Sequence, residues 1–272
     1  MTAGRRPYVL LTNDDGIDAP GLHALADALA PDYDLLIVAP HVERSATGHA
    51  ISVLKNLRLE RYERGGAHWG WSFEGRPADC VKVAVTTISP DRPFDLVLAG
   101  INAGQNLGVN VLYSGTVAAA REGVIFGIAS IAFSVVYRDP DRVPYATGAR
   151  VAVELTRRVV ERGLPPGVLL NVNVPDLPYD ALQGYAVTRQ GRSYFRDKFE
   201  RVQGDLEGRA IFRNVGDRFA ASPDGQFDLD DQAIAQRRVS VTPLHVDATA
   251  HHHVRSVQDL FRPQGPQSPP GA

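Results

Sequence analysis

Short apolar runs alternate with segments of helical period along this chain, and this alternation restricts its fold more than any other feature. Runs such as 8–12 (YVLLT) and 95–100 (DLVLAG) are largely apolar, as in strands buried on both faces. Between them lie amphipathic stretches such as 145–163, which ends in glycine. The alternation predicts an α/β protein with a parallel sheet and helices on both faces. We expect 69–75 to form a further strand, paired with 49–54.

The later part of the chain has a different pattern. Residues 184–231 are rich in Arg, Asp, Gly and Phe and lack helical period, which predicts a C-terminal β-hairpin arm on a core of residues 7–183. A final strand is expected within 232–250, and the Pro-rich residues 263–272 are expected to be disordered. The arm has too little core of its own, so we expect its aromatic side chains to be buried in a homodimer or homotetramer. These side chains are Phe195, Phe199, Phe212 and Phe219.

Charge and cysteine content argue against several classes of protein. The 272 residues carry 29 basic and 31 acidic side chains, so no basic surplus indicates a nucleic-acid polymer as partner. No apolar run is long enough to span a bilayer, and the apolar stretch after Arg6 fits a first strand better than a signal peptide. The single cysteine, Cys80, excludes an internal disulfide and is expected to be buried. A cytoplasmic protein without a membrane partner is therefore expected.

Two adjacent carboxylates follow the first predicted strand. Asn13, Asp14, Asp15 and Gly16 stand at its carboxyl end, where ligands collect in doubly wound sheets. A turn or a helix cap explains most Asp-Gly pairs, but a cap uses only one carboxylate. Two neighbouring carboxylates repel each other unless a cation is bound, and oxygen ligands favour Mg²⁺, Mn²⁺ or Ca²⁺ over zinc. The pair therefore indicates a metal site, with a turn or cap as the alternative.

The loop after 95–100 is the second polar cluster, rich in Gly and Asn. Its amide side chains are Asn102, Asn106 and Asn110, and it ends in Ser114, Gly115 and Thr116 before a helical segment. Free N–H groups at a helix start, with two hydroxyls and a glycine, favour a phosphate site, although a cap alone explains Ser114. The common dinucleotide and P-loop motifs are absent from the sequence, which argues against a hydride-transfer enzyme and a P-loop NTPase.

These motifs, in this order, resemble those of the SurE family of nucleotidases. The matching stretches are LLTNDDGIDAPGL, APHVERSATGHAIS, GRPADCVKVA, VLAGINAGQNLGVNVLYSGTVAAAREG, LLNVNVP, VTRQGR and RRVSVTPL. The resemblance implies a Rossmann-like core, a divalent metal and hydrolysis of nucleoside 5′- and 3′-monophosphates, with short polyphosphate as a substrate of some members. Carried over by motif, the metal ligands are Asp14, Asp15, Ser45 and Asn102, and the residues around the phosphate are Ser114, Gly115 and Thr116.

The chain departs from the family pattern at three positions. Ala46 follows Ser45 where the family usually has glycine, Arg76 stands where threonine is frequent, and Ala118 stands where glycine is common. Each change adds bulk at a loop or a helix start, which bears on loop detail and substrate preference. The ligands that the resemblance implies are intact.

The predicted reaction is hydrolysis of a phosphate monoester by direct attack of water. A bound cation supplies charge neutralisation and an acidified water, while Ser114, Thr116 and the helix start hold the other phosphate oxygens. Asn106 is expected to assist. A phospho-aspartate is disfavoured, because the D-x-D spacing of aspartyl-phosphate phosphatases is absent and both carboxylates are needed as ligands. The expected catalytic residues are Asp14, Asp15 and Asn102.

Two other functions are the alternatives. A nucleoside hydrolase also begins with an acidic cluster after its first strand, but it needs a further aspartate where Thr12 and Asn13 stand. A metal-dependent nucleotide-binding regulator without turnover is expected to lack a ligand, and no ligand is missing. Release of phosphate, of free base or of neither separates the three functions.

Several basic residues outside these clusters have two interpretations each. His251–His253 are better explained by a solvated loop than by a metal site, because consecutive side chains rarely converge on one ion. His41 and His49 are candidates for protonating the leaving group or simply surface residues. Arg189 and Arg192 are candidates for phosphate contacts or for ion pairs within the arm.

Overall fold

The computed structural model describes residues 5–204, 208–216, 218–220 and 228–262. Its core is one nine-stranded sheet. In spatial order the strands are β3 (Leu59–Arg64), β4 (Ala67–Phe73), β2 (Asp34–Pro40), β1 (Tyr8–Thr12), β5 (Leu96–Ala103), β6 (Ser130–Val135), β7 (Val168–Val174), β13 (Val239–His245) and β8 (Tyr185–Val187). All neighbours from β4 to β7 run parallel, whereas β3 and β13 are antiparallel to β4 and β7. This sheet confirms the predicted α/β, Rossmann-like core.

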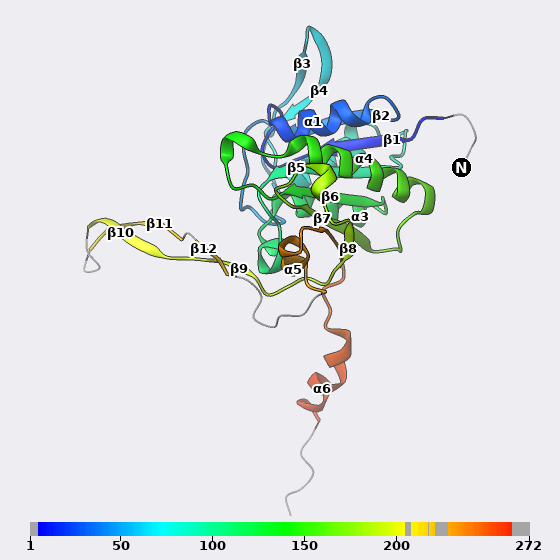
Figure 1. The fold of residues 1–272 in the computed structure, drawn as a ribbon. Helices are drawn as coiled ribbons and strands as arrows, with labels where there is room; N and C mark the ends of the chain where they lie inside the picture. The colour runs from blue at the N-terminus through cyan, green and yellow to red at the C-terminus, as the bar shows by residue number, and fades with distance from the viewer. Residues whose placement is uncertain (1–4, 205–207, 217, 221–227, 263–272) are drawn as a thin grey trace, which may run out of the picture.

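Both faces of the sheet are covered by helices (Figure 1). The covering helices are α1 (Pro20–Leu29) and α4 (Tyr145–Arg162) on one face, and α2 (Pro77–Val83) and α3 (Gly115–Ile125) on the other. Side chains of β1 alternate between the faces, so Leu11 packs with α1 and α4 while Leu10 packs with α2 and α3. Each such burial contributes about 1.5–3 kcal/mol. The uninterrupted apolar runs of the sequence are therefore strands with a core on both sides.

One predicted strand pairing is wrong. β4 pairs with β3 at 59–64, while 49–54 forms a loop. The reason lies in two local features. Gly65 and Gly66 have φ of 63° and 78°, which suits the two-residue turn that joins β3 to β4. The Asp79 carboxylate accepts the Ser52 N–H at 3.0 Å, which holds the 49–54 loop against α2.

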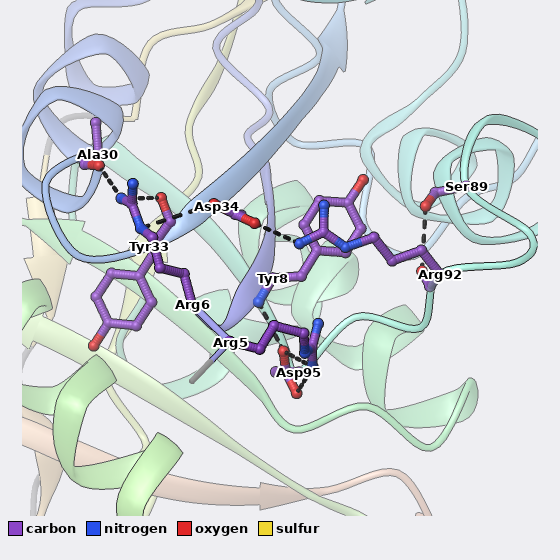
Figure 2. Close-up of polar contacts among 9 residues, drawn as sticks. All are labelled: Arg5, Arg6, Tyr8, Ala30, Tyr33, Asp34, Ser89, Arg92 and Asp95. Carbon is purple, nitrogen blue, oxygen red and sulfur yellow. Dashed lines mark hydrogen bonds and ion pairs between the residues drawn. The ribbon is translucent and has the colours of Figure 1, made fainter. Parts of the chain in front are cut away.

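The amino-terminal ends of β1, β2 and β5 are joined by a polar network (Figure 2). The Asp95 carboxylate accepts the Tyr8 N–H at 2.7 Å and the Arg5 guanidinium at 2.8 Å. The Arg92 guanidinium lies 3.7 Å from the centre of the Tyr8 ring and donates to Asp34 at 2.5 Å. This network lies at the end of the sheet opposite to the carboxyl ends of the parallel strands.

An extended arm and a short terminal helix project from this core (Figure 1). The arm contains β9 (Tyr194–Arg196), β10 (Phe199–Gly204), β11 (Ala210–Asn214) and β12 (Arg218–Ala220), with β10 antiparallel to β11 and β9 antiparallel to β12. These strands are the predicted hairpin extension, although β8, which falls in the range expected for the arm, joins the main sheet beside β13. The side chain of Phe219 and the expected disordered tail, 263–272, lie outside the described residues.

The remaining helical elements are short. They are α5 (Asp230–Ala235), α6 (Val254–Asp259), the π-helix η1 (Ala84–Ile88), and the 3₁₀ helices η2 (Gly108–Leu112), η3 (Pro140–Arg142), η4 (Tyr179–Ala181) and η5 (His251–His253). Within the described residues, no helix is both long and apolar enough to cross a membrane.

Candidate active site

The two carboxylates lie on a turn that begins where β1 ends. The Asn13 side chain closes this turn, because its Nδ2 donates to the Gly16 carbonyl at 2.7 Å and its Oδ1 accepts the Gly16 N–H at 3.2 Å. Asp14 is only 4% exposed, whereas Asp15 is half-buried. The turn therefore holds one carboxylate inside the protein and the other at its margin.

Asp14 lies against the start of α3. The Thr116 hydroxyl donates to Asp14 Oδ1, and the backbone N–H groups of Gly115 and Thr116 also approach this carboxylate. A Cβ added to Gly115 would lie 2.8 Å from Asp14 Cβ and 2.9 Å from Oδ2, so only glycine permits this approach. Burial raises the pKa of Asp14, and these hydrogen bonds oppose the rise. The helix start thus holds the Asp14 carboxylate in one orientation.

Asp15 is the second unusual carboxylate. Burial raises its pKa to about 7, the negative charges of Asp14 and Glu43 add to the rise, and a backbone hydrogen bond at Ala103 opposes it. Holding both aspartates ionised near neutral pH therefore costs free energy. A proton or a bound cation relieves that cost.

The other two ligands implied by the resemblance flank this pair. Asn102 is the penultimate residue of β5, and its Nδ2 donates to the Gly104 carbonyl at 2.7 Å, which leaves Oδ1 as an acceptor. Ser45 lies in the loop after β2, where its hydroxyl donates to Glu43 at 2.7 Å. The Arg44 N–H donates to the Asp14 carbonyl at 2.7 Å and holds this loop beside β1. The four residues thus come from three neighbouring strand ends.

Ala46, one of the departures from the family pattern, has a backbone conformation that glycine adopts more easily. Its φ is 55°, in the left-handed region, which costs a residue with a Cβ on the order of 1 kcal/mol. The glycine usual in the family avoids this cost. Ala46 adopts this conformation and adds a methyl group to the wall of the cavity.

The strand ends that carry the predicted site residues border one cavity of about 810 Å³. Of the predicted site residues, the lining includes Asp14, Ser45, Asn102, Asn106 and Ser114. Asp15, Gly115 and Thr116 are not part of the lining, and Thr116 is fully buried against Asp14. The Ser114 hydroxyl accepts the Val117 N–H at 3.1 Å, so Ser114 caps α3 as well as facing the cavity.

Asn106 is fixed by the asparagines of β7. Its Nδ2 donates to the Ser134 hydroxyl at 2.8 Å, and its N–H donates to Asn173 Oδ1 at 2.8 Å. Asn171 and Asn173 donate to its carbonyl at 2.7 and 3.1 Å. The LLNVNVP motif is thereby explained, because its two buried amides hold the loop that follows Asn102 over the strand ends.

Sequence reasoning missed part of the cavity wall. Asn110, one of the three loop amides named from the sequence, also lines the cavity, and the additional lining residues include Tyr113, Tyr194, Phe195, Asp197 and Asn214. Tyr113 directly precedes Ser114, and this adjacency was the one available signal. The last four come from the arm, where Phe195 had been interpreted only as a subunit contact. No local pattern relates the arm to a loop some 80 residues earlier.

The histidine candidates lie outside the cavity lining. The His49 ring contacts the buried Glu122 carboxylate at 2.8 Å, and Lys82 contacts the same carboxylate at 2.6 Å, so His49 links its loop to α3. His41 contacts the Ser72 hydroxyl at 3.0 Å. His251 contacts Asp247 at 2.8 Å.

Among the described residues, no three or more His, Cys, Asp or Glu side chains form a metal-binding cluster. Arg189 forms an ion pair with Asp228 at 2.6 Å, and neither Arg189 nor Arg192 lines the cavity.

Cys80 is fully buried, as predicted, and burial raises the pKa of its thiol, which makes a nucleophilic role unfavourable.

The chain is similar to known proteins over most of its length. Residues 9–197 match the family described as "Survival protein SurE". The chain is 43% identical over 253 residues to "5′-nucleotidase SurE" of Heliobacterium modesticaldum, covering 92% of this chain and 90% of that protein. It is also 43% identical over 253 residues to the protein of the same name from Syntrophus aciditrophicus, covering 93% of each. The crystal structure of the SurE protein from Aquifex aeolicus superposes with a TM-score of 0.81 at 35% identity, covering 94% of this chain and 100% of that chain. The chain therefore belongs to the SurE family.

Proposed function

We propose that this protein is a divalent-metal-dependent phosphomonoesterase that hydrolyses nucleoside 5′- and 3′-monophosphates to nucleoside and phosphate, and short polyphosphates as well. The observation that carries the proposal is the buried Asp14 at the start of α3, in a cavity that Ser45, Asn102 and Ser114 also line. Relatives named 5′-nucleotidase SurE support the nucleotidase activity. The 3′-nucleotidase and polyphosphate activities rest on the resemblance of the motifs.

The donor set fits a hard divalent cation. Asp14, Asp15, Ser45 and Asn102 offer only oxygen donors, which suit Mg²⁺ or Mn²⁺, and also Ca²⁺, better than zinc. Burial raises the pKa of both aspartates, so a bound cation would offset the cost of holding them ionised near neutral pH. When bound, the cation supplies charge neutralisation at the phosphate and a water of lowered pKa.

The chain itself supplies orientation. Thr116 and the backbone of α3 hold the Asp14 carboxylate, so this ligand is already oriented before substrate binds. Ser114 faces the cavity from the same helix start, and we assign to its hydroxyl a contact with a phosphate oxygen. Hydrogen bonds to the asparagines of β7 hold Asn106, and this keeps the loop after Asn102 in place. Because no histidine among the described residues lines the cavity, we assign the proton taken up by the leaving alkoxide to solvent water.

A phosphate-release screen tests this function. The protein is treated with chelator and then assayed with 5′- and 3′-nucleotides and short polyphosphates, with Mg²⁺, Mn²⁺ or Ca²⁺ added in turn. We expect phosphate release that depends on Mg²⁺ or Mn²⁺ and stops when chelator is added again. Release of free base instead of phosphate would identify a nucleoside hydrolase. Nucleotide binding without any product would identify a regulator.

The arm leads to a prediction about assembly. Phe199 and Phe212 are exposed on the single chain, as are Val202 and Ile211 beside them, and exposed apolar clusters of this kind are typical of interfaces. We propose that the protein is a homodimer or homotetramer joined through the arm. Light scattering at micromolar concentration should give the mass of two or four chains, and Phe199→Ser combined with Phe212→Ser should reduce it. A monomeric wild type would contradict the proposal.

The nucleoside monophosphate is the proposed small-molecule partner. The cytoplasmic location and the absence of nucleic-acid-polymer and membrane partners remain predictions from the sequence.

A further inference from the structure

One buried carboxylate takes no part in the reaction described above. Glu122, in the second half of α3, is only 2% exposed and does not line the cavity. Its Oε2 accepts a hydrogen bond from His49 Nε2 at 2.8 Å, and its Oε1 accepts one from Lys82 Nζ at 2.6 Å. Burying an unpaired carboxylate costs free energy, so the burial of Glu122 depends on these two partners.

The two partners come from different parts of the chain. Lys82 lies on α2, whereas His49 lies in the loop that carries Ser45. Burial alone would raise the pKa of Glu122, but the hydrogen bonds from His49 and Lys82 lower it below its ordinary value. The carboxylate is therefore ionised near neutral pH and can only accept, which means that the His49 ring nitrogen is the donor.

Packing the loop against α3 does not by itself require charged groups. Apolar side chains of similar volume often stabilise a buried position as well as an ion pair does. A hydrogen-bonded ion pair differs from apolar packing because it fixes both the distance and the direction between its two groups. The contact between His49 and Glu122 therefore indicates that the position of the loop matters, and not only its burial.

Ser45 lies in a compact turn just before His49. The Thr47 hydroxyl donates to the Arg44 carbonyl at 2.9 Å, which closes this turn on itself. The backbone at each end of the turn is hydrogen-bonded to a neighbouring segment. Because the turn is closed and short, a displacement of His49 moves the turn as a whole, and the Ser45 hydroxyl moves with it.

We propose that His49 and Glu122 are positioning residues that hold the Ser45 hydroxyl at the proposed cation site. This inference rests on the proposed function and deepens it. Thr116, which orients Asp14, and Glu122 lie on the same helix, less than two turns apart. Helix α3 thereby sets the separation of two proposed ligands that follow different strands.

The test compares two variants that each remove one partner of Glu122. His49→Ala removes the contact to the Ser45 loop, whereas Lys82→Met removes the contact to α2. The carboxylate keeps one partner in either variant, so the fold should persist. Mn²⁺ binding to the metal-free protein is measured by calorimetry. Because supporting residues of metal ligands contribute 10- to 100-fold to affinity, His49→Ala should weaken Mn²⁺ binding about tenfold or more, and Lys82→Met should change it less than about twofold.

Two further variants show how His49 acts. His49→Gln should recover most of the Mn²⁺ affinity, because its amide can still donate to Glu122. In a Ser45→Ala background, His49→Ala should weaken Mn²⁺ binding little further, since the ligand that it positions is already absent. A merely structural role of Glu122 predicts equal effects of His49→Ala and Lys82→Met. That result, an unchanged affinity in His49→Ala, or the same loss with and without Ser45 would overturn the inference.

Hydrogen exchange separates this inference from the function on which it rests. The backbone amides of residues 44–52 should exchange faster in His49→Ala than in wild type or Lys82→Met, with or without metal. Unchanged exchange in His49→Ala would contradict the positioning role. If wild type bound Mn²⁺ but released no phosphate from any ester, and only His49→Ala weakened that binding, the proposed reaction would fail and the positioning role would stand.

Discussion

Asp14→Asn should abolish nearly all phosphate release from nucleotides while leaving the fold intact. The substitution removes a charged ligand and keeps the shape of the side chain, and the Thr116 hydroxyl can still donate to the remaining oxygen. We expect kcat/KM to fall by about 100-fold or more, since even residues that only support metal ligands contribute 10- to 100-fold. In metal-free buffer the variant should be at least as stable as wild type, because a buried carboxylate beside Asp15 has been neutralised.

Thermal unfolding with and without metal completes this test. Wild type should gain stability on addition of Mg²⁺ or Mn²⁺, by about 2.7 kcal/mol at a hundredfold excess over Kd, and the variant should gain much less. Asp18→Asn is the matched control, because Asp18 is exposed on the following segment and does not line the cavity. Full activity of chelator-treated wild type would show that the carboxylates are structural. Unfolding of the variant alone in metal-free buffer would show the same.

Gly115→Ala should cause the second large loss, although it adds only one methyl group. The new Cβ would lie 2.8 Å from Asp14 Cβ and 2.9 Å from Oδ2, closer than packed atoms approach. Asp14 must therefore shift and weaken its hydrogen bonds to the start of α3. Because alanine favours helix more than glycine does, α3 itself should persist. We expect at least about a tenfold fall in kcat/KM, comparable to the loss of a supporting residue of a metal ligand.

A double-mutant cycle shows whether Gly115 acts through Asp14. The measured quantity is the rise in Tm caused by Mn²⁺. If Gly115→Ala acts by displacing Asp14, it should reduce this rise in wild type and have little further effect in the Asp14→Asn background. Equal reductions in both backgrounds would indicate a separate effect on the helix.

Local signals in the sequence predicted much of this fold. The buried strand β1 and the carboxylates after it are adjacent in the chain, so the apolar run and the Asn-Asp-Asp-Gly turn were sufficient to predict both. The pairing of β3 with β4 was not predicted. The apolar stretch 49–54 suggested the partner strand, but Asp79 holds this stretch in a loop, and a glycine turn joins β3 to β4 instead. Ser45 and Asn102 were assigned as metal ligands by resemblance alone, since a single hydroxyl or amide in a loop carries little signal of its own.

Two further features depend on the direction of a side chain and on contacts between distant segments. Thr116 was predicted to face the phosphate, and in the structure its hydroxyl points to Asp14, which no pattern of residue types reveals. Asp230, which lies far from both segments in sequence, joins the backbone of Gly108 in η2 to that of Gly191, three residues before β9, and so helps to hold Tyr194 and Phe195 beside the cavity. Contacts of this kind depend on how the whole chain packs.

The Ser45 loop is attached close to Ser45 on both sides. Before it, the Arg44 N–H is bonded to Asp14, and after it the Gly48 N–H is bonded to the Tyr113 carbonyl at 2.9 Å. The Ser45 hydroxyl, now bonded to Glu43, is exposed and needs only to rotate about its own side-chain bond to leave that partner. Rotations of exposed side chains take picoseconds to nanoseconds, whereas loop motions take nanoseconds to microseconds. Uptake of a cation at this site would therefore proceed without waiting for the loop to open.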